Sequence, residues 1–481
     1  MDSNKDASIL LELNINNNGY KFSSNIEMAL DNARLELLSV SKELKENEVS
    51  LKKLTPDCDK TDYVLASCSG ALCGIMDIFL VGSPNDSLIS NVTDEWFEGR
   101  VKDFAKLYGW QDNGSLSSAI RKLENVFSIP YDQRGAGDIA SWIYDLKPGN
   151  HHFKSLGHNP TLLGLFFSIL DQFCNTSHFV SDGNLLSLQE ADGKFVLQGG
   201  SVPAKLFCGF SNWLGHLISD VSGSSGGKGR GMGIPSPFWS WTNDIIAIKK
   251  TMRLPVGEFD KTINKLAVEI YEKGFDVRFQ ATQAIPVFVN EIIVRTMYSV
   301  RRLMKYFVEN KNNEKPFSAL WTFCEPFSNA SVKRMLTVAH GTFCLIDAGD
   351  ATLHGFISGG GTFDVKEFFM RLNIAGVGRF TISLYGEGNR VVKRYSLKKE
   401  TVEIEMRKQI LEDYIEGLKY LTQVFDDQLL LSFAQEFEES NVFIEAFDKS
   451  VQLAKKRGVS QKCILSKKSN IDSYFNPGGN N

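Results

Sequence analysis

The stretch Ile26–Leu51, which reads IEMALDNARLELLSVSKELKENEVSL, decides the fold class of this chain. Its apolar residues recur in alternating steps of four and three, which is the heptad spacing of a helix that packs along one seam. We therefore predict a long helix that packs against another helix of the same chain or self-associates with a second copy. The seam consists of Ile26, Leu30, Ala33, Leu37, Val40, Leu44, Asn47 and Leu51.

Helical periodicity returns near the other end of the chain, where Ile410, Tyr414 and Leu418 mark the apolar face of a charged amphipathic helix. Strand-like alternation is confined to about residues 340–396. The Gly386–Asn389 segment there resembles the turn of a hairpin between Phe380–Leu384 and Val391. The sequence thus predicts a mainly α-helical fold with a minor antiparallel β-hairpin element in that region.

Composition indicates a large globular protein of the cytoplasm. The 481 residues are 43% hydrophobic and 23% charged, which allows a sizeable core and excludes wholesale disorder. The net charge of −4 argues against a general affinity for nucleic acid. The chain begins with polar residues, and its eight cysteines form no C-x-x-C pair, so we expect a reducing compartment and no zinc knuckle.

Changes in charge and glycine content divide the chain into successive regions. The middle region stands out because it holds five of the seven histidines and 14 of the 40 glycines. The expected regions are a heptad helix (1–60), a helical region with an apolar small-residue helix (61–150), a low-charge Gly/His-rich region (151–250), a helical region (251–340), a small β element (341–396), charged amphipathic helices (397–458) and a flexible tail (459–481).

The stretch Val64–Gly82 is apolar and long enough to cross a bilayer. Gly70 and Gly74 form a G-x-x-x-G face on which helices approach closely, but Asp77 would be costly to place in lipid. We favour a buried core helix. The alternative is a segment that contacts membranes conditionally, together with 161–170 and 201–221, which would make the protein a peripheral or conditional membrane protein.

Three histidines lie close together in sequence, at His151, His152 and His158, and imidazoles are candidate general bases or metal ligands. Their H-H-x5-H spacing matches no known ligand motif, so structural histidines are favoured, and we expect no metal or other cofactor. Asp347 and Asp350 follow a strand-like run and form the best candidate pair of catalytic carboxylates.

The glycine-rich segment Ser222–Gly233 invites an anion-binding interpretation, because backbone N–H groups and the charges of Lys228 and Arg230 suit phosphates. It is not a Walker A motif, since Gly229 stands where Ser or Thr would hold Mg²⁺. A loop or hinge between helices is the favoured interpretation.

The C-terminal residues Lys467–Phe475 resemble the peptides with which replication and repair proteins bind a DNA clamp. Ile471, Tyr474 and Phe475 match the aliphatic and aromatic anchors of those peptides, whereas Lys468 replaces their usual Gln. The resemblance implies a clamp as one candidate partner.

The segments Asp62–Gly82, His151–Phe173 and Ser222–Asn243 resemble parts of uncharacterised bacterial accessory proteins associated with mobile elements or defence. The resemblance implies a bacterial accessory protein, with phage defence as a hypothesis. Our preferred function is a non-enzymatic helical effector that binds a protein partner or a membrane. The alternatives are an enzyme that uses the histidines or the glycine-rich loop, and a clamp-tethered DNA accessory protein. Convergence of the polar side chains in space would favour the enzyme.

Overall fold

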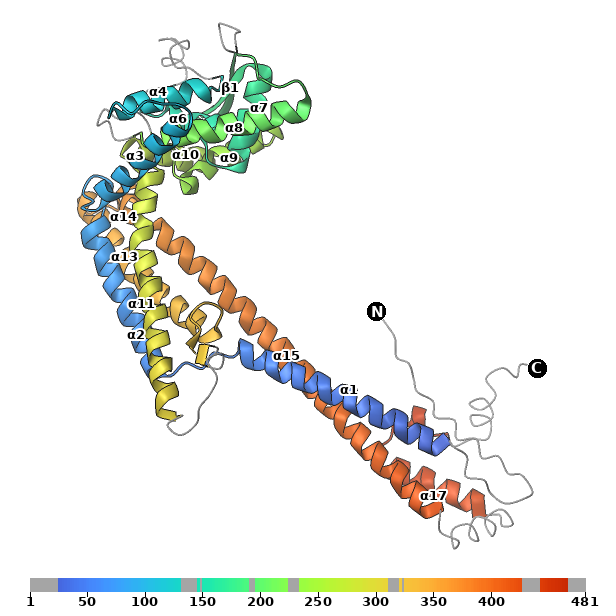
Figure 1. Ribbon diagram of the computed structural model, residues 1–481. Helices are drawn as coiled ribbons and strands as arrows, with labels where there is room; N and C mark the ends of the chain where they lie inside the picture. Colours follow the sequence, from blue (N-terminus) through green and yellow to red (C-terminus); the bar gives the residue numbers. More distant parts are fainter. Residues whose placement is uncertain are drawn as a thin grey trace. The chain divides into compact units, whose positions relative to one another are not determined.

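The computed structural model describes residues 25–130, 145–147, 149–189, 195–223, 233–309, 320–321, 324–425 and 442–465. Most of these residues are helical, and the described part contains one two-stranded antiparallel sheet (Figure 1). The prediction of a mainly α-helical protein with a minor β-hairpin is therefore confirmed.

The helices are long at both ends of the chain and shorter between residues 90 and 272. The strands are β1 (Thr176–Ser181) and β2 (Asn184–Gln189). The helices and helical turns are α1 (Asn25–Leu54), α2 (Lys60–Met76), the π-helical turn η1 (Asp77–Val81), α3 (Ser90–Leu107), α4 (Leu116–Val126), α6 (His151–Lys154), the 3-10 turn η2 (Leu156–His158), α7 (Leu162–Cys174), α8 (Val202–Asp220), α9 (Pro237–Thr251), α10 (Glu258–Glu272), α11 (Val277–Glu309), α13 (Ala330–Ser358), α14 (Val365–Arg371), α15 (Ile374–Phe425), α17 (Val442–Lys456) and η3 (Gln461–Cys463).

The chain divides into two compact units. The terminal unit combines residues 1–52 with residues 394–481, and the central unit comprises residues 53–393. In the terminal unit, the heptad seam of α1 is its least exposed face, with Val40 only 1% exposed. Glu36 on α1 pairs with Arg407 on α15, where Ile404 and Leu418 are also buried. Self-association through α1 stays a prediction.

In the central unit, α2 packs closely along α13 (Figure 1). A Cβ added to Gly70 would lie 2.1 Å from the carbonyl oxygen of Ala339, and one added to Gly74 would lie 3.1 Å from Ile346. The small-residue face of α2 therefore lets two helix backbones approach inside the core. Among the described residues, one helix, Lys60–Val81, is long and apolar enough to cross a bilayer by length and composition. Membrane contact stays a prediction.

The predicted position of the β element was wrong. Thr342–Ile346 and Leu353–Ile357 lie within α13, and the segment from Phe380 through the expected turn at Gly386–Asn389 to Val391 lies within α15. Alternation over five residues is a weak signal, because long-range packing overrides it. Here Phe343 is fully buried on α13 and leaves no room for a Cβ at Gly376 of α15.

The hairpin forms instead between β1 and β2, with Ser181 opposite Asn184. Asp182 and Gly183 form its two-residue turn, with φ values of 49° and 74°. Asp-Gly is a favoured pair for such turns, because both central residues of a type I′ turn need positive φ. On β1, Phe179 is buried and forms an isolated bridge with Ser155, which fixes the hairpin beside α6 and η2.

Candidate metal centre

The short helical turns α6 and η2 bring the three neighbouring histidines together, and α8 adds two further side chains. His151 and His152 begin α6, and His158 ends η2. On α8, His216 and Asp220 are four residues apart, so both point to the same side of that helix. The start of α8 is set by Ser201, whose hydroxyl accepts a hydrogen bond from the backbone N–H of Ala204.

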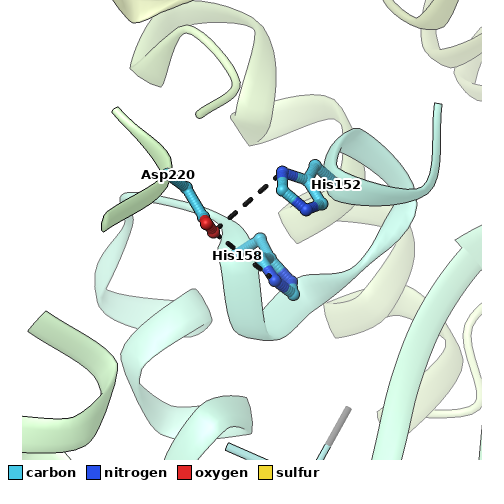
Figure 2. A group of neighbouring side chains, drawn as sticks. All are labelled: His152, His158 and Asp220. Atoms are coloured by element: carbon cyan, nitrogen blue, oxygen red, sulfur yellow. Dashed lines mark ion pairs between the residues drawn. The ribbon is translucent and has the colours of Figure 1, made fainter. Parts of the chain in front are cut away.

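The imidazoles of His152, His158 and His216 converge on the carboxylate of Asp220. Figure 2 shows the first two of these rings directed at Asp220. The distances to Asp220 Oδ2 are 3.4 Å from His216 Nε2, 3.7 Å from His158 Nε2 and 4.0 Å from His152 Nδ1. The Nε2 atoms of His158 and His216 are 3.1 Å apart. The rings of His152 and His158 are stacked, with their centroids 4.4 Å apart.

The cluster is buried, and burial sets its charge state. Burial lowers the pKa of His152 to about 3 and that of His216 to about 4, and it lowers the pKa of His158 well below its ordinary value. These imidazoles are therefore neutral near pH 7 and carry a lone pair. Burial also raises the pKa of Asp220 to about 7, although the nearby His152 opposes that shift.

Hydrogen bonds hold part of the cluster in place. The Oγ atom of Ser155 lies 2.9 Å from His158 Nδ1, and the same Ser155 is bridged to β1. Such contacts fix the orientation of a ligating imidazole. Within the described part of the chain, His152 Nδ1 and Asp220 Oδ2 are buried without a hydrogen bond. Buried polar atoms of this kind are rare unless a water or an ion satisfies them.

Donor atoms of His152, His158 and Asp220 all lie within 4.8 Å of one another, which is close enough for one metal ion to bind all three. His216 Nε2 lies close to two of these residues, at 3.1 Å from His158 Nε2 and 3.4 Å from Asp220 Oδ2. None of the eight cysteines belongs to the cluster. The arrangement is a set of neutral nitrogen donors around one carboxylate.

A comparison of the chain with protein-family models, with curated proteins and with solved structures finds no match. The chemistry of the site is accordingly inferred from its own residues.

The sequence pointed to part of this cluster. The predicted group consisted of His151, His152 and His158, which are neighbours in sequence, and it contained neither His216 nor Asp220. The missed signal is the H-x-x-x-D spacing on an expected helix, which places a nitrogen and an oxygen donor on one face. His178, another histidine of the 151–250 region, instead pairs with Asp171.

Two sets of predicted site residues lie outside the described residues. These are Lys228 and Arg230 of the glycine-rich segment, and Ile471, Tyr474 and Phe475 of the clamp-like motif. Their predicted anion and clamp contacts stay predictions.

The predicted carboxylate pair, Asp347 and Asp350, lies on α13 and not after a strand. Asp350 forms a 2.8 Å ion pair with Arg371. Asp347 accepts a 2.9 Å hydrogen bond from the backbone N–H of Asn373, whose side-chain amide donates to Asp77 at 2.6 Å. Asp77, the one charged residue of the apolar stretch Val64–Gly82, is only 2% exposed. These contacts tie α2, α13 and the start of α15 together in the interior.

Proposed function

We propose that this protein is a metal-dependent hydrolase whose divalent metal ion, most naturally Zn²⁺, is held by His152, His158, His216 and Asp220. The observation that carries the proposal is the convergence of three neutral imidazoles on one buried carboxylate whose Oδ2 makes no hydrogen bond among the described residues. A cation would compensate the charge that Asp220 otherwise buries at a cost in free energy.

The spacing of the donor atoms fits a zinc ion. Tetrahedral Zn²⁺ with bonds of 2.0–2.1 Å to nitrogen holds neighbouring donors about 3.3 Å apart. The distance is 3.1 Å between His158 and His216, 3.7 Å from His158 to Asp220 and 3.4 Å from His216 to Asp220. His152, at 4.0 Å from Asp220, requires the largest adjustment. His158, His216 and Asp220 thus lie near the spacing of ligands to one ion, and His152 lies further from Asp220.

The types of donor favour a catalytic over a structural metal. Structural zinc sites are rich in cysteine, whereas catalytic sites use histidines with a carboxylate and keep a position for water. With all four side chains bound, a water would be a fifth ligand, and catalytic zinc can expand to five-coordinate. A bound zinc ion would supply Lewis acidity and a water of lowered pKa.

The residues of the chain contribute binding, orientation and proton transfer. The neutral rings of His158 and His216 donate lone pairs, and Ser155 orients the first of them. Burial limits bulk water and strengthens the attraction between Asp220 and a cation. His151, whose ring centroid lies 4.3 Å from that of His152, is the base that we assign to proton transfer beside the metal.

The convergence supports the enzyme alternative of the sequence analysis over the non-enzymatic effector. Dispersed histidines would have favoured the effector. A protein partner, a role in bacterial defence and a cytoplasmic location remain predictions.

Metal content tests the proposal. We expect the full-length chain to bind one Zn²⁺ per molecule in a titration of metal-free protein with zinc. Asp220→Asn keeps the size of the side chain but removes its charge, and His216→Gln removes an imidazole. We expect each change to lower the zinc affinity by about tenfold or more, because ligand loss leaves the remaining donors buried and uncompensated.

The chain offers a matched control in Asp350 and His354, which form a 3.6 Å pair at the same spacing of four residues on α13. His354→Gln should leave zinc binding unchanged. Absence of stoichiometric zinc binding, or equal losses in His354→Gln and His216→Gln, would refute the metal centre.

Hydrolysis is tested separately from binding. The zinc-loaded chain should cleave one or more chromogenic esters from a panel of carboxylic, phosphomonoester and phosphodiester substrates. Asp220→Asn should abolish that cleavage, and His151→Ala should lower it while zinc stays bound. A loaded protein that cleaves none of the three classes would contradict the hydrolase assignment but leave the metal site standing.

A further inference from the structure

We infer that a second site, a cationic cavity between α11, α13 and α15, binds a phosphorylated organic anion of the nucleotide class. The cavity belongs to the central unit and has a volume of about 350 Å³. That volume falls within the range of small-molecule sites, which begins at about 300 Å³. This inference does not depend on the proposed metal centre.

Basic side chains dominate the lining of the cavity. Glu387 is the only acidic residue among the lining residues of the described chain. The basic lining residues are Arg295, Lys333, Arg379, Arg390 and Lys393.

Internal ion pairs cancel only part of this positive charge. Arg295 and Arg379 share the carboxylate of Glu291, which lies behind the lining. Glu387 is likewise shared, by Arg390 and by Arg334 of α13. Each carboxylate thus faces two guanidinium groups, and the lining itself holds five basic side chains and one acidic side chain. Guanidinium groups held in this way are pre-oriented to donate to phosphate oxygens.

Two lysines add charge without an ion pair of their own among the described residues. Lys333 and Lys393 are exposed side chains on α13 and α15, at the rim of the cavity. The charge of Lys333 helps to lower the pKa of the nearby Glu325. The carboxylate of Glu325, however, accepts its hydrogen bonds from the backbone N–H groups of Phe327 and Ser328. With both arginine pairs counted, the cavity carries a clear excess of positive charge, which attracts a multiply charged anion.

An apolar wall completes the cavity and argues for an organic group beside the phosphates. Phe327 and Ile382 line it and are 65% and 66% exposed, and the buried Leu336 lines it as well. The guanidinium of Arg295 lies 5.5 Å from the centroid of the Phe327 ring. Aromatic rings next to basic groups are the usual means by which proteins bind a nucleobase together with its phosphates. Inorganic phosphate alone would make no contact with this apolar wall.

Binding of ATP to the full-length chain tests the inference, with inorganic pyrophosphate as the second probe. Titration calorimetry in the presence of EDTA keeps metal at the histidine cluster from contributing. We expect saturable binding of ATP that is tighter than that of pyrophosphate. The double variant Lys333→Ala with Lys393→Ala should lower the affinity for both ATP and pyrophosphate by about tenfold or more. The reason is that each lysine contributes a charge-assisted contact to phosphate.

Control variants separate the site from general electrostatics. Lys265→Ala/Lys273→Ala removes the same charge from exposed positions elsewhere in the central unit and should leave both affinities unchanged. Phe327→Ala should lower the affinity for ATP but leave the affinity for pyrophosphate unchanged.

Three outcomes would overturn the inference: no binding of ATP by the unaltered chain, equal losses in the two lysine variants, or equal affinity for ATP and pyrophosphate. None of these outcomes bears on zinc binding, so this site and the proposed metal centre stand or fall separately.

Discussion

Asp77 shows how a single buried residue ties the central unit together. It lies in the π-helical turn η1 that extends α2, and the amide of Asn373 donates to it. Burial raises the pKa of Asp77 to about 9, and the negative charge of Asp347 adds to that rise. Burial also raises the pKa of Asp347. Two carboxyl groups in contact cannot both ionise inside a protein, so they share a proton at neutral pH, with Asp77 as donor to Asp347.

This shared proton makes stability depend on pH. A carboxyl whose pKa is higher in the folded than in the unfolded protein stabilises most at low pH, and that contribution is lost as pH rises toward 9. For one proton the free energy of unfolding should fall by about 1.4 kcal/mol per pH unit in this range. We expect Asp77→Asn, measured by urea denaturation at pH 6 and pH 8.5, to show a flatter dependence than the unaltered chain. The exposed Asp103→Asn should keep the original slope. An unchanged slope in Asp77→Asn would contradict the shared proton.

At the scale of elements, α15 continues through a segment that local propensity disfavours. Gly386 and Gly388 fall inside this helix, although glycine is among the weakest helix formers. Contacts with α13 hold the segment: Arg334 pairs with Glu387, and Arg390 donates to the carbonyl oxygen of Ala330 at 3.0 Å. Tertiary contacts thus override the tendency toward a turn.

A substitution distinguishes the helix from the hairpin that the sequence suggested. A Cβ at Gly388 would meet no atom within 4 Å, so Gly388→Ala should raise the free energy of unfolding by about 0.5–1 kcal/mol. In a hairpin turn the same change would lower it. Gly376→Ala in the same helix is the opposite case, because its Cβ would lie 2.3 Å from the ring of Phe343. This substitution should lower the free energy of unfolding. Thermal unfolding followed by circular dichroism measures both.

At the scale of the whole molecule, the central unit contains the proposed metal centre and the cationic cavity. The four proposed ligands and every residue that lines the cavity fall between residues 53 and 393. The terminal unit contributes its own helix contacts through α1 and the later part of α15.

We therefore expect a chain of residues 53–393 to fold by itself and to keep its zinc site. Its thermal unfolding should be cooperative, and its zinc stoichiometry and affinity should equal those of the full-length chain, because no ligand is removed. Circular dichroism and a zinc titration check this. A chain that aggregates, or that loses zinc binding, would show that the terminal unit is required.

The sequence by itself determined the helical class and the faces of several helices. The heptad seam of Ile26–Leu51 coincides with the buried face of α1, and the glycines at Gly70 and Gly74 mark the contact with α13. These features could be predicted because their signals are local: a period of 3.6 residues and small residues four apart are visible within one segment. The signal of the Asp182-Gly183 turn is equally local, because Asp-Gly is itself a favoured pair for a two-residue hairpin turn.

Only the tertiary structure decided the composition of the site and the position of the sheet. His158 and His216 are 58 residues apart in sequence, and Asp77 is paired with a residue of α13 that follows it by 270 positions. No periodicity links such residues, because which helix faces meet depends on the packing of the complete core. For the same reason Phe380–Leu384 alternates like a strand but is helical, since the contacts of α13 and α15 outweigh the preference of five residues.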